Sequence, residues 1–580
     1  MAIYRSDQAQ VTFQTEINAG AYVELATGKT DGTGTAAING AHTAGAKTLT
    51  VDAVSGITAG EFIQIGAALA NHAEVREAVH VTATSILLNA PTAFPHADND
   101  TIQVVTGVNE VSADQYINLI PGVYETVDTP DPEMAIEGRY FLGTASKRNY
   151  FAAYSGQQTY SGSIGGFVLL NGKSLRYPIG KVNTTTTYLN TAGGTSPTHG
   201  GLLSADAKKG DILVNIDNML APLTQNGFLV FTGSTSPATT STATTEVRKY
   251  ISTTQGGASQ TNARLDYPLQ FDHDDNEYVY MVMTAASGST IALSTDSTHV
   301  IPYTHTISET VDLDSVTWHV HMLPSDEDAT KAFDRRYFGG KIGSMTISAE
   351  EGGMVTAGWD SVNFLGMVHN QKSSSAPGTP SVPFYSPMQS ITSGEVEFPT
   401  TEPYYFSQGE VSLFGQTIAK VRSFSLSISN NEEPRYYISK QLGRRRGPTE
   451  IKEQRREYSC AVTLALPDAA AANTAQRTVW NELLLEGNYG GTNFNRKGKT
   501  GFDITFTLTR GEIDTNTGST DDKITITIPS SSAATGGNSQ GALIRTAPHN
   551  ITEDNPFQVE ADILFRSMKI DIQDAEHYYP

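Results

Sequence analysis

Residues 421–429 read VRSFSLSIS, and residues 344–350 read SMTISAE. Apolar and polar side chains alternate along both stretches, which is the pattern of a β-strand that buries one face and exposes the other. The alternation recurs on both sides of these stretches, in LTVDAV (49–54), FIQIG (62–66), FDITFTLT (502–509), KITITIP (523–529) and QVEADILFRSMKIDI (558–572). The sequence therefore predicts an all-β chain of antiparallel sheets, β-dominated with one helix.

The one predicted helix lies at residues 468–487, DAAAANTAQRTVWNELLLEG. Pro467 and Asp468 offer a helix start, and Val479, Leu483 and Leu484 fall on one helical face. One helix among so many strands leaves the architecture β-dominated.

Residues 48–105 and residues 211–282 form an internal repeat, because matching strand-like segments follow in the same order in both copies. Glu74-Val75-Arg76 corresponds to Glu246-Val247-Arg248, and the turn FPHADND (94–100) corresponds to FDHDDNE (271–277). A fixed order of matching segments indicates a repeated structural unit. We interpret the repeat as two copies of a small β-barrel-like module inserted into a host domain.

A weaker repeat lies in the host domain, where residues 338–353 (FGGKIGSMTISAEEGG) match residues 414–433 (FGQTIAKVRSFSLSISNNEE). Each is followed by a further alternating strand, so we expect two related β-sandwich or barrel domains in tandem. The predicted boundaries are an N-terminal arm with the first host strands (1–30), module 1 (31–107), the host continued (108–195), module 2 (196–289), the rest of the first half (290–400) and the second half with the helix (401–580).

Composition excludes several classes of protein. The chain has 580 residues, 38% of them hydrophobic, which is enough to build a core, so a wholly disordered chain is excluded. The formal net charge of −22 argues against broad attraction to nucleic acid or to an anionic membrane. The single cysteine, Cys460, cannot form an intrachain disulfide, and its place in an alternating strand predicts a buried inert thiol. With no signal peptide and no long apolar run, we expect assembly in a cytoplasm.

No catalytic residue, cofactor site or metal site is expected, because the common nucleotide, zinc and nucleophile motifs are absent from the sequence. His319 and His321 share one strand face, but without a third ligand we interpret them as surface histidines. The turns HADND (96–100) and HDDNE (273–277) offer oxygen ligands for a cation, although Asp and Asn favour plain turns as well. The candidate cation ligands are Asp98, Asp100, Asp274 and Asp275.

One basic cluster stands out in the stretch GRRRGPTEIKEQRRE (443–457). A contact with an acidic face of a neighbouring copy fits this cluster best, because interleaved glutamates weaken its field toward nucleic acid. A plain solvated loop and a nucleic-acid contact are the alternatives. The candidate contact residues are Arg444, Arg445, Arg446, Arg455 and Arg456.

Four segments together resemble the major tail tube proteins of long-tailed bacterial and archaeal viruses. They are the opening QVTFQTEINAGAYVE (10–24), the segment from Glu137 to Val182 with its GSIGGF and NGK motifs, the FGGKIGSMTISAEEGG stretch (338–353), and residues 421–466 with SFSLSISNNEE. About half of the chain takes part. The two inserted modules are additions to the minimal fold of tail tube proteins.

The resemblance implies a mechanism of assembly. In that family two antiparallel sheets pack orthogonally, strands of adjacent subunits continue one sheet around a lumen, and rings stack with loops and terminal arms reaching the next ring. The lumen holds a tape-measure protein and later passes double-stranded DNA without binding it specifically. The expected partners are other copies in trimeric or hexameric rings, the tape-measure protein, and tail terminator and baseplate proteins, with no membrane. The modules are expected to face outward on a virion tail.

Three other functions are alternatives for this sequence. A virion adhesin or fibre protein would use the Ser/Thr/Gly-rich modules to bind a glycan. A polysaccharide depolymerase would need an aromatic and acidic groove, for which Tyr404, Tyr405 and Phe406 are the nearest candidates. A tail terminator, baseplate hub or capsid-decoration protein of related fold would share the sandwich without polymerising.

Overall fold

A computed structural model describes most of the chain. It covers residues 4–16, 34–66, 74–104, 118–139, 152–186, 200–211, 213–217, 228–236, 243–255, 260–265, 267–281, 302–324, 333–369, 401–413, 421–437, 447–465, 503–515, 518–529, 542–546 and 558–576, with short pieces at 20, 28–29, 107–108, 396–397, 416–418, 549–550 and 579. The predicted helix at 468–487 lies outside the described residues. In the described ranges the helical elements are two 3-10 turns, η1 (Lys173–Leu175) and η4 (Phe406–Gln408). None of these residues forms a helix long and apolar enough to cross a membrane.

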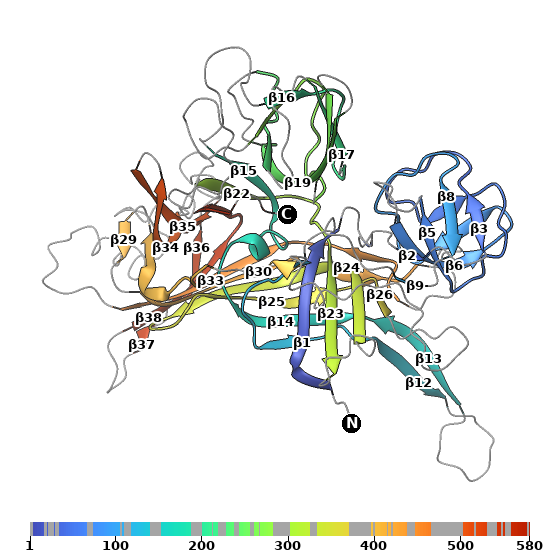
Figure 1. The fold of residues 1–580 in the computed structure, drawn as a ribbon. Coiled ribbons are helices and arrows are strands. Elements are labelled where there is room, and N and C mark those ends of the chain that lie inside the picture. Colours follow the sequence, from blue (N-terminus) through green and yellow to red (C-terminus); the bar gives the residue numbers. More distant parts are fainter. Residues whose placement is uncertain are drawn as a thin grey trace, which may run out of the picture.

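The larger sheet has 14 strands and runs through the middle of the molecule (Figure 1). Its main path is β27 (Val396–Glu397), β10 (Asn118–Leu119), β1 (Tyr4–Thr15), β23 (Val316–Pro324), β24 (Phe333–Glu350), β30 (Val421–Ser429), β33 (Glu457–Ala465), β38 (Gln558–Phe565) and β36 (Leu543–Thr546). Off this path lie β11 (Thr126–Asp128), β14 (Ser161–Val168), β25 (Thr356–Asn363), β26 (Gly366–His369) and β37 (His549–Asn550).

The second sheet has seven strands and packs against the first. Its order is β15 (Gly180–Thr185), β22 (Tyr303–Glu309), β39 (Lys569–Asp574), β35 (Gly518–Ile528), β34 (Ile504–Thr515), β28 (Gly409–Leu413) and β29 (Gln416–Ile418). We call these two sheets together the body.

One hydrophobic core fills the space between the sheets of the body, and the alternating sequence explains it. Along β30, Phe424, Leu426 and Ile428 are buried while their neighbours are not. The ring of Phe424 lies 4.9 Å from the ring of Phe506 on β34, centroid to centroid. Burial of each such side chain stabilises the fold by about 1.5–3 kcal/mol. The predicted all-β class with antiparallel sheets is confirmed.

The two segments of the weaker repeat lie side by side. β24 pairs antiparallel with β30, with Met345 opposite Ile428 and Ile347 opposite Leu426. Apolar side chains therefore face apolar ones across the strands, which stabilises the pairing. Because β24 precedes and β30 follows the predicted boundary at residue 400, both halves of the host share one continuous sheet.

The strong repeat forms two compact units outside the body, drawn in blue and green in Figure 1. Module 1 is a six-stranded sheet in the order β3 (Thr35–Ala37), β8 (Thr101–Val104), β5 (Phe62–Ile65), β6 (Glu74–Val81), β7 (Ser85–Leu88) and β4 (Thr48–Thr50). Module 2 is a closed barrel in the order β16 (Gly200–Leu203), β21 (Tyr278–Met281), β18 (Phe228–Phe231), β19 (Glu246–Gln255), β20 (Gln260–Leu265) and β17 (Leu213–Asp217).

Matching strands occupy matching places in the two modules, so the repeat in the sequence is a repeat in the fold. In module 2, β16 pairs with β17 and closes the barrel. In module 1 the same closure rests on two isolated bridges, Thr35 to Ser55 and Ile38 to Val51. Three short ribbons complete the described strands: β2 (Gly28–Lys29) with β9 (Gly107–Val108), β12 (Glu133–Arg139) with β13 (Ala152–Thr159), and β31 (Glu433–Arg435) with β32 (Glu450–Lys452).

Candidate assembly surfaces and module joints

The hairpin of β12 and β13 projects away from the body (Figure 1). Every residue of β12 is exposed, and β13 has only its first and seventh residues partly covered. Ile136 pairs with Ser155, while Glu137 pairs with Tyr154, so Ile136 and Tyr154 point to opposite faces of the ribbon. Their side chains are 68% and 60% exposed.

A two-stranded ribbon with both faces in water has no core of its own and is marginally stable in isolation. Large apolar side chains on each face are a feature of surfaces that another molecule covers. The hairpin is therefore the clearest candidate contact surface in the described part of the chain. Its sequence gives little sign of such a surface, because the alternation in EMAIEGR is as weak as that of a surface loop.

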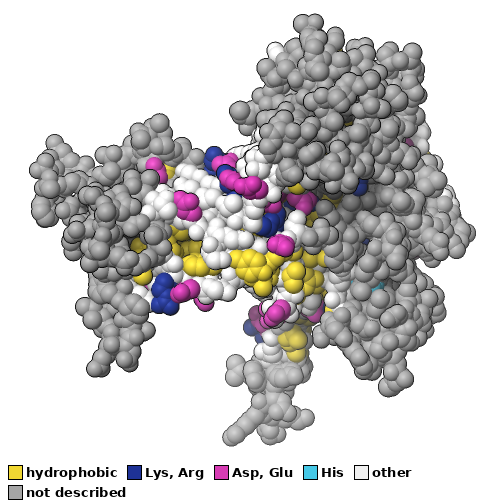
Figure 2. All heavy atoms as spheres, turned by 60° about the vertical axis from the view of Figure 1, so that its left-hand side comes forward, with side chains coloured by type: hydrophobic (Ala, Val, Ile, Leu, Met, Phe, Trp, Pro, Cys, Tyr) yellow, Lys and Arg dark blue, Asp and Glu magenta, His cyan; other side chains and the backbone are white. Residues whose placement is uncertain are grey.

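A second candidate surface lies where the two sheets of the body part. A hollow of about 200 Å³ opens between η4, β28, β30 and β34, and polar atoms form most of its exposed wall. Its lining also includes the apolar residues Phe406, Val411, Val421, Phe424, Phe506 and Leu508. The described surface in Figure 2 also carries a band of apolar side chains between charged ones. An exposed apolar band of this kind favours contact with another protein.

The arginines of the predicted contact cluster divide into two groups. Arg444, Arg445 and Arg446 lie outside the described residues. The Arg455 side chain is 86% exposed, with its Nε 3.9 Å from Glu457 Oε1. Arg456 instead binds the body, since its Nε donates to Asn430 Oδ1 at 2.8 Å and its second terminal nitrogen donates to the carbonyl of Thr310 at 3.3 Å. A role for the cluster at a subunit contact stays a prediction.

Glu432 lies half-buried, three residues beyond the end of β30. Burial raises the pKa of its carboxyl to about 8, even though the side-chain amide of Asn363 donates to Glu432 Oε2 at 3.5 Å and Lys341 attracts it. Lys341 is itself engaged by Glu453, with 2.5 Å between Nζ and Oε1. Glu432 therefore keeps its proton in the folded chain at neutral pH.

Glu432 gives the protein a pH-dependent stability with a definite sign. The folded chain holds this proton up to about pH 8, whereas the unfolded chain releases it near the ordinary value of 4.5. The stabilisation linked to this proton is full below pH 4.5, the ordinary pKa of the unfolded chain, and is lost as the pH rises through about 8, the pKa in the folded chain. We expect Glu432→Gln to flatten this part of the profile in urea unfolding measured across that range. An unchanged slope in the variant would contradict the assignment.

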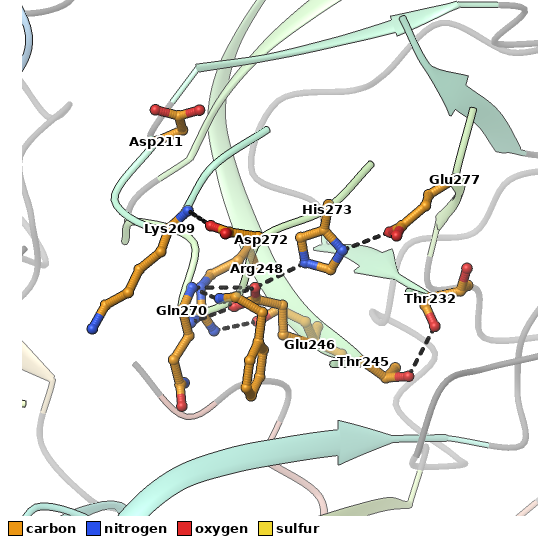
Figure 3. Close-up of polar contacts among 12 residues, drawn as sticks. Lys209, Asp211, Thr232, Thr245, Glu246, Arg248, Gln270, Asp272, His273 and Glu277 are labelled. Carbon is orange, nitrogen blue, oxygen red and sulfur yellow. Dashed lines mark hydrogen bonds and ion pairs between the residues drawn. The ribbon is translucent and has the colours of Figure 1, made fainter. Parts of the chain in front are cut away.

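Module 2 contains a buried polar cluster around Glu246 (Figure 3). Its Oε2 lies 2.7 Å from a terminal nitrogen of Arg248, and its Oε1 lies 3.0 Å from Nε2 of His273. The backbone amides of Gln270 and Phe271 also donate to this carboxylate. Arg248 in turn donates from Nε to the carbonyl of Pro268 at 3.0 Å. The cluster fixes the loop of residues 267–271 to β19.

The ionisable groups of this cluster shift one another's pKa values. Burial raises the pKa of Glu246, but Arg248 and His273 outweigh it and hold the pKa below its ordinary value. Burial lowers the pKa of His273, but its hydrogen bonds to Glu246 and Glu277 raise it to about 9. At neutral pH the cluster therefore contains a carboxylate flanked by two cations.

Module 1 repeats this cluster at the equivalent positions. Glu74 lies 2.6 Å from a terminal nitrogen of Arg76 and 2.7 Å from Nε2 of His96, and its carboxylate accepts from the amides of Ala93 and Phe94. Arg76 donates from Nε to the carbonyl of Pro91 at 3.0 Å. The repeated Glu-Val-Arg and Phe-x-His motifs are thus explained by one buried framework, which sequence reasoning had not assigned.

Both modules contact the body close to these clusters. In module 2, Gln270 accepts a hydrogen bond from the amide of Val182 on β15, and its carbonyl accepts one from Lys181 Nζ. In module 1, Ala90, Phe62 and Val75 pack with Phe338 and Val368 of the body. The contact between module 2 and the body is therefore polar, whereas the contact between module 1 and the body is apolar.

The predicted cation turns serve the fold of the modules. Asp98 accepts from the amide of Gly40, and Asp100 accepts from the amide of Ala97, each at 2.7–2.8 Å. In module 2, Asp275 accepts from Asn276 Nδ2 at 2.7 Å, and the backbone carbonyl of Asp274 accepts from the amide of Glu277. Asn99 and Asn276 both have positive φ, at 68° and 66°, as tight turns often require. These hydrogen bonds are the ones expected if HADND and HDDNE are plain turns, the alternative to cation binding.

The remaining candidates lie inside the body. His319 and His321 are both buried in β23, so the interpretation as surface histidines was wrong; the reason is that β1 and β24 flank this strand within the 14-stranded sheet. Over the described ranges, no three His, Cys, Asp or Glu side chains are grouped as a metal site would require. Cys460 is buried, as predicted, and burial raises the pKa of its thiol to about 12. Tyr404 is buried too, and its hydroxyl donates to Asp522 Oδ1 at 2.9 Å.

Comparison with known proteins identifies the family. Residues 143–565 match the family described as phage tail tube protein. The chain belongs to this family, which makes it a component of a virion tail. No curated protein matches the chain. Among solved structures, a chain titled Phage phi92 endosialidase aligns with 97% of this chain and 69% of its own length, at 6% identity and a TM-score of 0.10, which carries no argument.

Proposed function

We propose that the chain is a non-enzymatic subunit that assembles into closed rings, and that these rings stack into the tail tube of a long-tailed bacterial or archaeal virus. The observation that carries the proposal is the exposed β12–β13 hairpin, whose apolar side chains on both faces need a partner. A second copy of the chain supplies that partner in every ring contact. Light scattering of the purified chain over time, with negative-stain images to separate tubes from amorphous aggregates, tests the proposal, because tube growth gives a continued rise in mass.

The proposed ring contains six chains. A trimer would imitate six-fold symmetry if the two repeated halves were related by rotation around the tube. Instead, the repeated strands β24 and β30 are antiparallel neighbours in one sheet. The internal repeat therefore lends no support to a trimer.

The proposed lumen first holds a tape-measure protein and later passes double-stranded DNA. The net charge of −22 favours this use, because an acidic wall repels phosphates and lets DNA slide past. Assembly in the host cytoplasm and contacts with tail terminator and baseplate proteins at the tube ends belong to the same proposal. An adhesin, a baseplate hub or a terminator would not polymerise, so these alternatives predict a constant mass in the scattering experiment.

The two modules are proposed to decorate the outside of the tube, since two units of this size would block a lumen. Lys29 pairs with Gly107 at the base of module 1, so the chain enters and leaves the module at adjacent positions. We expect tubes to form when residues 30–106 are replaced by an Asn-Gly turn, with Phe338 and Val368 changed to threonine because the module covers them. A folded variant that fails to polymerise would place module 1 in the ring wall. Electron microscopy would measure both polymerisation and the loss of outer density.

A further inference from the structure

Two neighbouring strands of the larger sheet carry a lysine and an asparagine at facing positions. Lys341 on β24 pairs directly with Asn363 on β25 in the antiparallel register. Side chains at directly opposite positions lie on the same face of a sheet, with their Cβ atoms about 4.5–5.5 Å apart. An amine and a carboxamide are therefore held within reach of each other.

Two carboxyl groups are brought to this pair by the turn that follows β30. The amide of Asn430 donates to the carbonyl of Gly343 on β24 at 2.7 Å, which ties the turn to the strand. Glu432 then lies against β24, where a Cβ atom on Gly343 would be only 3.3 Å from Glu432 Oε2. The amide of Gln454 donates to the carbonyl of Asn430 at 3.2 Å and so brings the adjacent Glu453 to the same place.

Each carboxyl group contacts one member of the pair. Glu453 Oε1 lies 2.5 Å from Lys341 Nζ, and these side chains are only 14% and 15% exposed. Glu432 Oε2 lies 3.5 Å from Asn363 Nδ2, while Glu432 Oε1 is buried and has no hydrogen-bond partner in the described part of the chain. Burial raises the pKa of Glu432 to about 8, so its carboxyl is a proton donor at neutral pH. The cluster therefore places a base at the amine and an acid at the amide nitrogen.

We propose that Lys341 and Asn363 form an intramolecular isopeptide bond, in a reaction that each chain carries out once on itself. Glu453 takes one proton from the Lys341 ammonium, and the flexible stem of the lysine brings the neutral amine to Cγ of Asn363. Glu432 gives its proton to Nδ2 and then takes a second proton from the attacking nitrogen. The bond between Nζ and Cγ forms, the bond between Cγ and Nδ2 breaks, and ammonia leaves.

An ion pair between Lys341 and Glu453 is the alternative without a reaction. It accounts for the lysine, but it leaves Glu432 with a buried oxygen that has no hydrogen-bond partner beside the amide of Asn363. A buried polar group left in this way costs free energy. The reaction gives Glu432 a function, and reactants oriented within one molecule react as if present at up to about 10⁵–10⁸ M.

The bond lies at the open end of the hairpin formed by β24 and β25, because the two strands are connected at the other end through residues 351–355. Residues 341–363 become a closed covalent ring, and one side of it, β24, also pairs with β23, β26 and β30. Such a ring stabilises a fold by restricting the unfolded chain, as a disulfide does. The inference goes beyond ring assembly and is independent of it, since all four side chains belong to one chain.

Mass spectrometry of the purified full chain tests the bond directly. Residues 342–371 contain no lysine or arginine, so trypsin cuts an unlinked chain after Lys341 and gives the peptides 337–341 and 342–372. We expect instead one uncut peptide, 337–372, that is lighter than its sequence by the mass of one ammonia. Further cleavage by a glutamate-specific protease at Glu350 or Glu351 should leave its two parts joined.

Three outcomes would overturn the proposal. Two separate peptides of unchanged mass would mean that the lysine forms an ion pair only. Loss of ammonia with Lys341 still open to trypsin would mean a succinimide at Asn363. Loss of water, with Lys341 joined to the peptide that contains Glu453, would mean condensation with the wrong partner.

Two variants test the assigned roles. Glu432→Gln keeps the shape of the side chain but removes its acid, so we expect the linked peptide to form roughly 100-fold more slowly. Lys341→Arg keeps a positive charge beside Glu453 and should give no linked peptide. Glu433→Gln is the matched control, because Glu433 is exposed and pairs with Arg435 at 2.8 Å, so this variant should link in full.

Thermal unfolding of each variant would show that the fold survives. A folded Glu432→Gln chain that links as fast as the wild type would overturn the role of Glu432 in the reaction.

Discussion

Replacing Ile136 and Tyr154 together by glutamate is expected to abolish polymerisation and leave a folded, unassembled chain. Both side chains are exposed, on opposite faces of the β12–β13 hairpin, so neither substitution disturbs a core. Exposed substitutions of this kind change stability by about 0.5 kcal/mol or less. At a subunit contact, by contrast, the new carboxylates would have to be desolvated without a partner, which is prohibitive when repeated around every ring.

Light scattering and negative-stain images of the variant would measure this effect, and thermal unfolding would show that the fold survives. Val311→Glu is the matched control, because Val311 is 90% exposed but lies outside the hairpin. Normal tubes from the double variant would remove the hairpin from the subunit contacts and would leave the hollow between the sheets as the better candidate.

Arg248→Met is expected to cause the largest loss of stability, confined at first to module 2. The substitution leaves Glu246 buried without its main cation and frees the carbonyl of Pro268. Breaking a buried ion pair in this way costs about 3–5 kcal/mol. Hydrogen exchange should show early opening of β18 and β19, while the strands of the body stay protected.

The double variant Glu246→Gln with Arg248→Met tests the reason for that loss. Removing both charges avoids an isolated buried carboxylate, so we expect it to recover much of the stability. Arg76→Met provides the matched comparison in module 1, where the same cluster should give a similar loss while module 2 stays intact. Equal stability of the wild type and Arg248→Met would show that the Glu246 cluster does not hold the loop of residues 267–271 on β19.

Several strands of the body were predictable because they carry a strict alternation. In β30 and β33 the apolar positions of the sequence are the buried positions of the structure. The repeat was equally clear, since the order of segments that matched in the sequence is the order of strands in both modules. Local pattern decides such features, because side chains alternate across a sheet whatever lies around it.

The polar clusters were not predictable from the same pattern. In EVREAVHV, Glu74 and Arg76 occupy the alternate positions that normally face water, yet both are fully buried. The loop of residues 89–96 covers this face of β6, and its backbone amides satisfy the carboxylate. His319 and His321 were misplaced for a related reason: the alternation in TWHVHML marks two faces but does not reveal that both are covered. Only the tertiary arrangement decides how many faces of a strand are buried.

Negative-stain electron microscopy of the purified full-length chain tests the central claim most directly. The account predicts hollow rods built from stacked rings, with six-fold symmetry in end-on views and outer density from the modules. Compact monomers, or isolated rings that never stack at high concentration, would contradict a tube-forming role for this chain.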